Sequence, residues 1–203
     1  MRTPRRRTGR LAERSEASIE ALLGVARRTF GRDGYTRASL DGIAAAARMT
    51  KGAVYHHFGS KEALFEEVFR REHRATIAAV TATGRAGTDP VDGLLKGIRA
   101  YLQAILDPIA RRVLLQDGPS VLGWERWRRC EEPGFQQLME ASLSAAAKRD
   151  MLRAGLRPAD TAILLLGAVT EGALTIAHAA NPAATARRLS RELTAHVEAL
   201  CRP

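Results

Sequence analysis

Apolar residues recur at helical spacing along most of this chain, and no segment alternates for long enough to form a useful β-strand. In the first half, the pattern predicts a helix over residues 15–31, two short helices within 39–58, and a long helix from Ser60 to about Gly84. A glycine-rich loop at 84–90 follows. We therefore predict an all-α fold in which the long helix joins two domains.

The second half predicts a larger helical domain, with expected helices at 90–106, 108–116, 134–154, 158–180 and 182–200. The breaks between them are placed at Asp107–Pro108, Asp117–Pro119 and Pro133–Gly134, because glycine and proline interrupt helices. Gly155 is expected to cap the helix before it. Proline suits a first helical turn, which supports helix starts at Pro158 and Pro182.

The most specific pattern lies between Ser39 and Lys61. Ser39 and Thr50 suit the N-cap position, because their hydroxyl oxygens can accept a backbone N–H of the first helical turn. Arg48–Met49 separates the two short helices, and a non-glycine residue with positive φ in that turn would be strained. The first of these helices presents a narrow apolar face at i, i+3, i+4 and i+7: Leu40, Ile43, Ala44 and Ala47.

The second short helix is apolar on one side and small or polar on the other. Val54 and Phe58 are spaced i and i+4 and are expected to point inward. The outward positions are Lys51, Gly52, Ala53, Tyr55 and His56. Small residues let a backbone approach the wall of a major groove, and the donors around them suit phosphates. This arrangement predicts a helix-turn-helix that binds double-stranded DNA.

The combined pattern of residues 15–65 resembles the N-terminal domain of the TetR family of bacterial transcription regulators. The resemblance rests on Phe30–Tyr35 at the end of the first helix, on Thr50–Phe58, and on Lys61–Leu64. It implies a three-helix DNA-binding domain at 15–65 and a larger helical domain at 66–203 for ligand binding and dimerisation.

The exposed face and the resemblance together give the expected DNA-binding residues: Thr36, Ser39, Thr50, Lys51, Gly52, Ala53, Tyr55, His56, His57 and Lys61. In the family, the matching tyrosine and lysine hold the DNA backbone, which points to Tyr55 and Lys61. Two positions depart from the family pattern, because Arg48 stands where glycine is usual and Met49 replaces a smaller aliphatic residue.

Charge supports the same assignment. The chain has 203 residues and a net charge of +10, and residues 1–61 hold 13 Lys and Arg against 5 Asp and Glu. The remaining 142 residues hold 19 against 17. Excess positive charge confined to one domain is typical of phosphate binding. Residues 1–14, with five arginines in the first ten, are expected to be a disordered basic arm that either enters a minor groove or stays a solvated tail.

The last two helices are expected to form a homodimer. Apolar residues surround the helix at 158–180 almost completely, and a second apolar stripe including Leu193 follows on the last helix. A helix that is apolar all round must be covered all round, either by a partner subunit or by a purely internal core. In the TetR family the last two helices form the homodimer, and its two-fold symmetry matches a palindromic operator.

The resemblance implies a small effector in the C-terminal domain, and the residues favour a hydrophobic one. The expected ligand-binding residues are the large or isolated polar side chains of that domain: Tyr101, Trp124, Trp127, Phe135, Met139, Glu171, Thr175 and His178. The alternative interpretation, which the residue types favour, makes His178 a hydrogen-bonded core or interface histidine and both tryptophans core anchors. No glycine-rich phosphate loop supports a nucleotide, and no cofactor is expected.

Other function classes fit poorly. The chain carries no nucleophile motif and no metal-ligand spacing, and its two cysteines are too few for a disulfide framework or a zinc site, which argues against an enzyme. The longest apolar run has eight residues, from Ala162 to Val169, so neither a membrane span nor a signal core is expected and the protein is placed in the cytoplasm. The sequence favours an effector-responsive DNA-binding repressor, with an effector-independent DNA-binding protein as the alternative.

Overall fold

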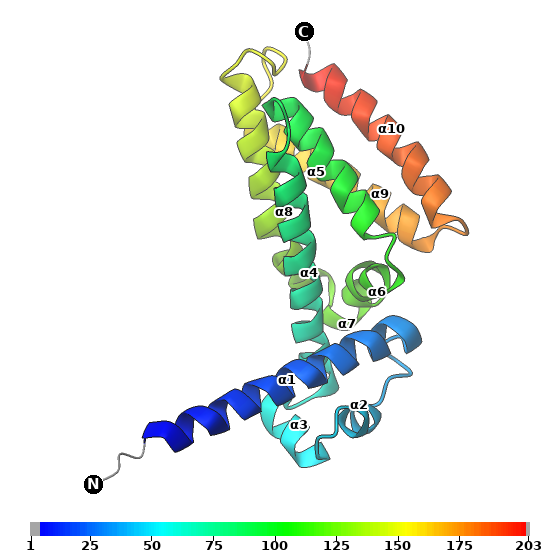
Figure 1. Ribbon diagram of the computed structural model, residues 1–203. Helices are drawn as coiled ribbons and strands as arrows, with labels where there is room; N and C mark the ends of the chain where they lie inside the picture. The colour runs from blue at the N-terminus through cyan, green and yellow to red at the C-terminus, as the bar shows by residue number, and fades with distance from the viewer. Residues whose placement is uncertain (1–4, 202–203) are drawn as a thin grey trace. The chain divides into compact units, whose positions relative to one another are not determined.

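The computed structural model describes the backbone of residues 5–201 and the side chains of residues 16–130 and 134–201. All regular elements within this part of the chain are helices, so the predicted all-α fold is confirmed (Figure 1). The chain divides into two compact units, residues 1–69 and 70–203. The division falls inside the long helix α4 (Lys61–Arg85), which contributes residues to both.

The N-terminal unit is built from α1 (Arg5–Asp33), α2 (Leu40–Ala46), α3 (Lys51–Phe58) and the first turns of α4. The helix α2 packs against both α1 and α3. Each helix places fully or almost fully buried apolar side chains in the core of this unit, among them Leu22, Phe30, Ile43, Val54 and Phe65.

The helix α1 begins at Arg5, well before the expected start at Ser15. Residues 5–14 contain no proline, and five of the ten are arginines, which have high helix propensity, so the helix extends through them. The expected basic arm therefore includes the first turns of α1. Its residues 1–4, and the side chains up to residue 15, lie outside the described residues, and its role on DNA stays a prediction.

The turn between α2 and α3 confirms the expected departure from glycine. Arg48 has φ +57°. The Met49 N–H donates to the carbonyl of Ala44 at 2.9 Å, and the Arg48 N–H donates to that of Ala45 at 3.0 Å. These two bonds define a Schellman closure, in which the residue at the position of Arg48 takes the left-handed conformation that glycine adopts without strain.

The C-terminal unit contains the rest of α4 and seven further elements. They are α5 (Pro90–Ala104), α6 (Pro108–Arg111), the π-helical turn η1 (Arg112–Asp117), α7 (Gly118–Leu122), α8 (Trp124–Ala147), α9 (Pro158–His178) and α10 (Pro182–Cys201). The helix α9 packs against α8 on one side and α10 on another, and α5 also contacts both α8 and α10. The expected starts at Pro158 and Pro182 are confirmed.

Two expected breaks are wrong. The chain stays helical through Asp117–Pro119, because Pro119 falls in the first turn of α7, where its missing N–H costs nothing. The helix α8 runs across Pro133–Gly134. The buried residues Trp127, Phe135, Met139 and Leu143 on either side of that proline share one helical face, so their packing outweighs the loss of a backbone hydrogen bond. The true break lies before α8, at Gly123 with φ +75°.

The helix α8 also ends earlier than expected, at Ala147 rather than near Ala154. Asp150 has φ +53°, and the Met151 N–H donates to the carbonyl of Ala146 at 2.9 Å. This is the same closure as at Arg48, again without glycine. Gly155, the expected cap, has φ +86° but lies in the loop that follows.

Candidate DNA-binding surface and effector cavity

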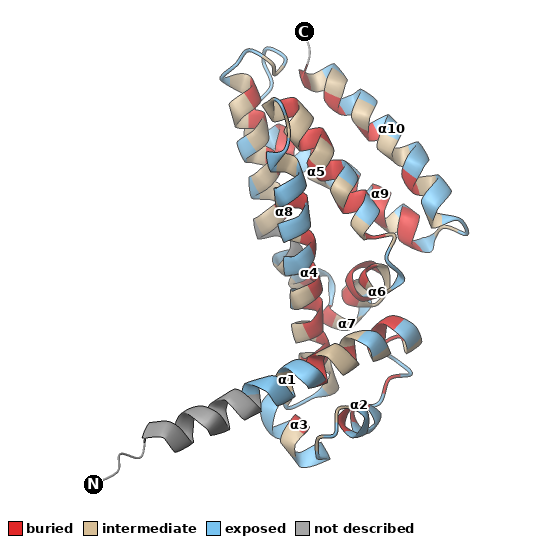
Figure 2. Cartoon of the chain, in the orientation of Figure 1, coloured by how far each residue is buried: buried red, intermediate tan, exposed pale blue. Residues whose placement is uncertain are grey.

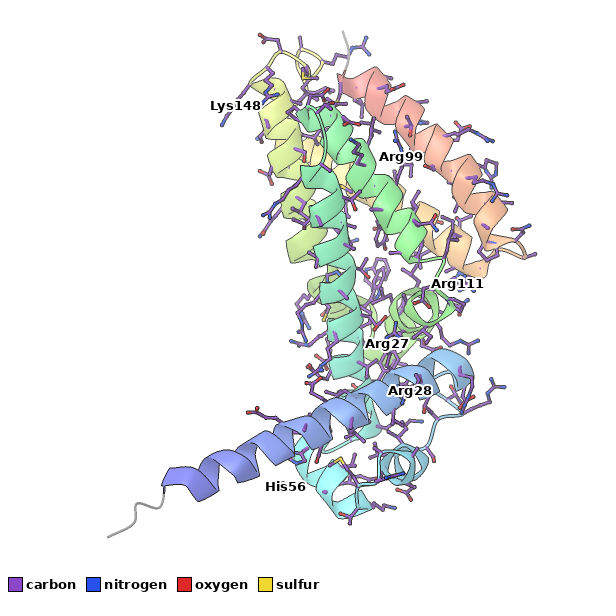
Figure 3. All side chains as sticks on the ribbon, viewed as in Figure 1. Arg27, Arg28, His56, Arg99, Arg111 and Lys148 are labelled. Atoms are coloured by element: carbon purple, nitrogen blue, oxygen red, sulfur yellow. The ribbon has the colours of Figure 1, made fainter. Side chains whose placement is uncertain are left out.

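The outer face of α3 is open to solvent. Lys51, Gly52, Tyr55, His56 and His57 are exposed, and Ala53 is half-exposed (Figures 2 and 3, with His56 labelled in the latter). A methyl group added at Gly52 would meet no atom within 4 Å, so this point of the helix offers bare backbone. Val54 holds the helix from its inner side and is fully buried. The sequence-predicted outward face is therefore the face that the fold leaves free.

The hydroxyls expected at the DNA surface are exposed, and two of them already cap helices. The Gly42 N–H donates to Ser39 Oγ at 3.0 Å, and the Ala53 N–H donates to Thr50 Oγ1 at 3.2 Å. Capping uses these oxygens as acceptors, which leaves each O–H free to donate to a phosphate. Thr36 is exposed in the loop between α1 and α2.

Lys51 forms an exposed ion pair with Asp41 of α2. Its Nζ lies 2.9 Å from Asp41 Oδ2 and 5.7 Å from the ring centre of Tyr55. The hydrogen bond and the charge of Asp41 raise the pKa of Lys51 above its ordinary value. Exposed pairs of this kind contribute little to stability, so Lys51 can exchange Asp41 for a phosphate at low cost.

Lys61 has different surroundings from Lys51. It is half-buried, and its Nζ donates to the backbone carbonyls of Tyr35 at 2.9 Å and Ala38 at 3.0 Å. The same ammonium lies 4.2 Å from the ring centre of Tyr35. Two of the three N–H groups of this ammonium are engaged, so the predicted contact with DNA would use the third or exchange one carbonyl for a phosphate. In this structure the ammonium ties the loop between α1 and α2 to the start of α4.

The C-terminal unit holds an apolar cavity of about 230 Å³. Its walls come from the second half of α4, from α5 and from α8, with one residue of α9. The backbones of α4 and α5 meet at its edge without side chains between them, since a Cβ on Gly93 would lie 2.8 Å from the carbonyl oxygen of Gly84. Only glycine permits this approach. The lining residues are Val80, Thr81, Gly84, Arg85, Gly93, Leu94, Gly97, Ile98, Tyr101, Phe135, Leu138, Met139, Ser142 and Val169.

The structure brings together three of the eight expected ligand-binding residues. Tyr101, Phe135 and Met139 line the cavity, and the rings of the first two meet edge-on at 4.7 Å. Both tryptophans lie outside it. Trp127 is a buried core anchor whose Nε1–H donates to the carbonyl of Leu114 at 2.8 Å, while Trp124 is 55% exposed and packs against Trp127.

The three polar residues of α9 also lie outside the cavity. Glu171 and Thr175 are exposed and line a groove between α9 and α10. His178 is exposed at the end of α9, where its Nδ1 lies 2.9 Å from the carbonyl oxygen of Leu174. The expectation that these residues share a site with Tyr101 is wrong, because α9 turns only Val169 toward the cavity and its polar side chains elsewhere.

Sequence reasoning missed the contribution of α4. Thr81 and Arg85 line the cavity from this helix, and Ser142 lines it from α8. The available signal was the cluster of glycines at 84, 87, 93 and 97, which marks two backbones in close approach rather than a simple loop. Large side chains do not mark a wall of this kind, because glycines form it.

The groove between α9 and α10 is a second apolar feature of this unit. It has a volume of about 470 Å³ and includes Leu164, which is 76% exposed. By length and composition α9 also passes as a membrane span, but the core helix of a soluble protein passes the same test, and α9 is packed against α8 and α10. The exposed leucines therefore mark a surface that a partner would cover.

Comparison with known families decides the broader assignment. A family model described as bacterial regulatory proteins, tetR family, matches residues 22–68. A second model, described as tetracyclin repressor-like, C-terminal domain, matches residues 91–200. The chain belongs to the TetR family of bacterial transcription regulators. Members of this family are DNA-binding transcription factors that act as dimers, so the predicted DNA-binding function is confirmed at this level.

Individual TetR-family proteins resemble this chain over most of its length. The TetC protein of transposon Tn10 from Escherichia coli is 26% identical over 142 residues, which are 70% of this chain and 72% of the relative. The DNA-binding transcriptional repressor TetR of Mycobacteroides abscessus is 30% identical over 141 residues, 68% of this chain and 73% of the relative. A crystal structure of a TetR-family regulator from Pectobacterium atrosepticum has a TM-score of 0.80 at 28% identity and covers 98% of both chains.

The two lysines of the DNA-binding unit give the first prediction. Lys51→Met removes an exposed charge, so it should flatten the dependence of log affinity on log salt by about one unit while leaving the unfolding temperature unchanged. Lys61→Met removes the donor to two carbonyls and should destabilise the protein by about 1–3 kcal/mol. Titration of a duplex DNA at several salt concentrations and urea unfolding measure the two effects. A flattened salt dependence with unchanged stability in the Lys61 variant would instead place Lys61 on phosphate.

His73 gives the second prediction. It is buried on α4 with its ring 5.4 Å from that of Phe135. Burial, helped by the charge of Arg74, lowers the pKa of His73 to about 4. In the unfolded chain His73 becomes protonated near pH 6.5, whereas in the folded chain it stays neutral until about pH 4. The stabilising contribution of neutral His73 is therefore complete above pH 6.5 and declines as the pH falls toward 4, by at most about 3 kcal/mol.

Urea unfolding at pH 7 and pH 4.5 tests this contribution. His73→Gln should lose less stability between the two pH values than the wild type does. His178→Gln, a change at an exposed histidine, is the matched control and should keep the wild-type dependence. Parallel curves for the wild type and the His73 variant would contradict the assignment.

Proposed function

We propose that this TetR-family regulator is a homodimeric repressor that leaves a palindromic operator when a small, largely apolar effector binds in the cavity of its C-terminal unit. The observation that carries the proposal is the position of α4. This one helix begins in the DNA-binding unit and supplies Val80, Thr81, Gly84 and Arg85 to the cavity wall. A ligand that displaces this wall acts on the helix that supports the DNA-binding helices.

The proposed DNA contacts divide into three groups by chemistry. Lys51, Tyr55, His56 and His57 carry donors on the exposed face of α3 and bind phosphates or base edges. Gly52 and Ala53 allow the backbone of α3 to approach the groove. The remaining contacts come from hydroxyls that can donate to phosphates: Thr36, Ser39 and Thr50.

The proposed dimer forms through α9 and α10. The groove between them is apolar and includes the exposed Leu164, and Ile163 is a second exposed apolar side chain on α9; together they form a surface that a partner would cover. Leu193 also lines this groove, but it is only 8% exposed in the single chain and approaches Gly172 of α9, so a substitution there would disturb packing within the subunit as well as the seam. A second copy placed by a two-fold axis covers both exposed patches with the same surface.

Release from DNA requires a difference in binding between two states. An effector that binds both the DNA-bound and the DNA-free form equally well leaves operator affinity unchanged, however tight it is. A tenfold loss of operator affinity needs about 1.4 kcal/mol of differential binding, which lies within the usual range of allosteric coupling. The cavity is partly enclosed by α4, so a change in the position of this helix alters the space available to the ligand.

Selection of bound sites from a random DNA pool tests the DNA-binding part of the proposal. We expect an enriched palindrome whose half-sites lie about 10 base pairs apart or a multiple of this spacing, because one dimer places two copies of α3 on one face of the duplex. Tyr55→Ala should weaken the enrichment. Enrichment of a single asymmetric site, or of none, would contradict a symmetric operator.

The seam has its own test. Leu164→Asp places a charge in the proposed apolar interface and should give a folded monomer, because Leu164 is exposed in the single chain and its loss costs the subunit little. Gln137→Asp, at an exposed position of α8, is the control and should remain dimeric. Light scattering and circular dichroism measure mass and folding. A stable dimer of the Leu164 variant would place the seam elsewhere.

A further inference from the structure

A single charged side chain, and a positive one, lines the cavity. Among its fourteen lining residues, Arg85 is the one charged side chain, and no aspartate or glutamate is present. Three lining residues carry hydroxyls, Thr81, Tyr101 and Ser142, and the rest are apolar or glycine. A cavity with one cation at its wall and no acid disfavours cationic ligands and favours an anionic group attached to an apolar body.

Arg85 is available to such a ligand. It is exposed at the end of α4, and within the part of the chain that the structure describes it forms no ion pair or hydrogen bond. The acids of the adjoining loop are already engaged. Asp89 accepts the N–H groups of Val91 and Asp92 at 2.9 Å, and the Asp92 carboxylate pairs with Lys96 at 2.9 Å. Neither carboxylate therefore competes with an anionic ligand for the guanidinium of Arg85.

The hydroxyls supply the second donor. The Thr81 O–H donates to the carbonyl of Ile77 at 2.8 Å, so Thr81 has no proton left for a ligand. Ser142 is half-buried on the facing helix α8 and makes no hydrogen bond within the described residues, so its O–H is free. A planar guanidinium and one hydroxyl match a carboxylate, whose two oxygens accept from both. A phosphate, with more charge and more oxygens, would be left under-coordinated.

We infer that the effector of this protein is an amphipathic monocarboxylic acid, with its carboxylate held by Arg85 and Ser142 and its hydrocarbon tail in the apolar cavity. The inference rests on the proposed effector site. The volume of about 230 Å³ lies below the 300–1,000 Å³ usual for drug-sized ligands, so the tail is short or medium in length. The rings of Tyr101 and Phe135 contact it.

Three unbranched eight-carbon probes test the inference: octanoate, octanol and octylammonium. Their head groups are an anion, a neutral hydroxyl and a cation. Calorimetry on the full-length protein should give octanoate an affinity at least about tenfold higher than octanol, with octylammonium weakest. Arg85→Gln should lower octanoate affinity at least about tenfold and leave octanol binding unchanged. Ser142→Ala should lower octanoate affinity about tenfold, in line with the loss of one hydrogen bond to a charged group.

Arg99→Gln is the matched control, because Arg99 is exposed on α5 and does not line the cavity (Figure 3). It should bind all three probes as the wild type does. Circular dichroism confirms that each variant is folded.

The other outcomes would contradict either the carboxylate assignment alone or the effector site as well. Equal affinity for octanoate and octanol, or unchanged octanoate binding in Arg85→Gln, would overturn the carboxylate assignment while leaving an apolar effector site in place. Failure of all three probes to bind would overturn both the assignment and this cavity as the effector site. DNA binding is separate, since the selected operator should bind Arg85→Gln and wild type equally in the absence of probe.

Discussion

The N-terminal unit depends on one aromatic cluster. The ring of Phe65 at the start of α4 meets Phe30 of α1 edge-on at 5.2 Å and Tyr35 at 5.3 Å, and Lys61 closes the cluster from above Tyr35. The contact between Tyr35 and Phe65 fixes the loop that leads to Ser39, and Ser39 is the N-cap of α2. The orientation of α2, and with it the position at which α3 leaves the turn, follows from packing that lies outside the helix-turn-helix itself. A DNA-reading surface with few buried residues of its own requires such support.

Arg48, in the turn between α2 and α3, combines a strained backbone conformation with an exposed positive charge. Arg48 occupies a left-handed conformation that glycine would take without strain, at a cost on the order of 1–2 kcal/mol. In exchange, the exposed turn carries a positive charge beside α3. Two Schellman hydrogen bonds offset this strain, because they hold the residue in place.

Local chemistry could be predicted from the sequence, whereas tertiary choices could not. The caps at Ser39 and Thr50, the helix starts at Pro158 and Pro182, and the positive φ of Arg48 all depend on neighbours in sequence, and all are confirmed. The break expected at Pro133 failed because contacts of α8 far along the chain outweigh a local breaker.

The candidate site also has features that the local sequence predicts and features that depend on tertiary contacts. The exposed face of α3 followed from spacing alone. The inward turn of Lys61 and the distribution of α9 side chains over two surfaces depend on which neighbours a helix meets. Tyr101, Phe135 and Met139 were chosen as large side chains and do line the cavity, whereas Arg85 lies on a helix whose place in the cavity wall was indicated only by the glycines around it.

The glycine contact between α4 and α5 has a consequence for how the cavity responds to size. At Gly84, Gly87 and Gly93 the backbones meet directly, so at this contact there is no side chain that could change rotamer to make room. The opposite wall, with Leu138 and Met139 of α8, is made of flexible side chains that adapt to shape. In the proposed effector site, a ligand that is slightly too large would be accommodated by the α8 side chains, whereas the same excess against the glycine contact would have to move the backbone of α4 or α5. The proposed site is therefore adaptable on its α8 side and stiff at the glycine contact, so the direction in which a ligand exceeds the cavity would decide whether α4 moves.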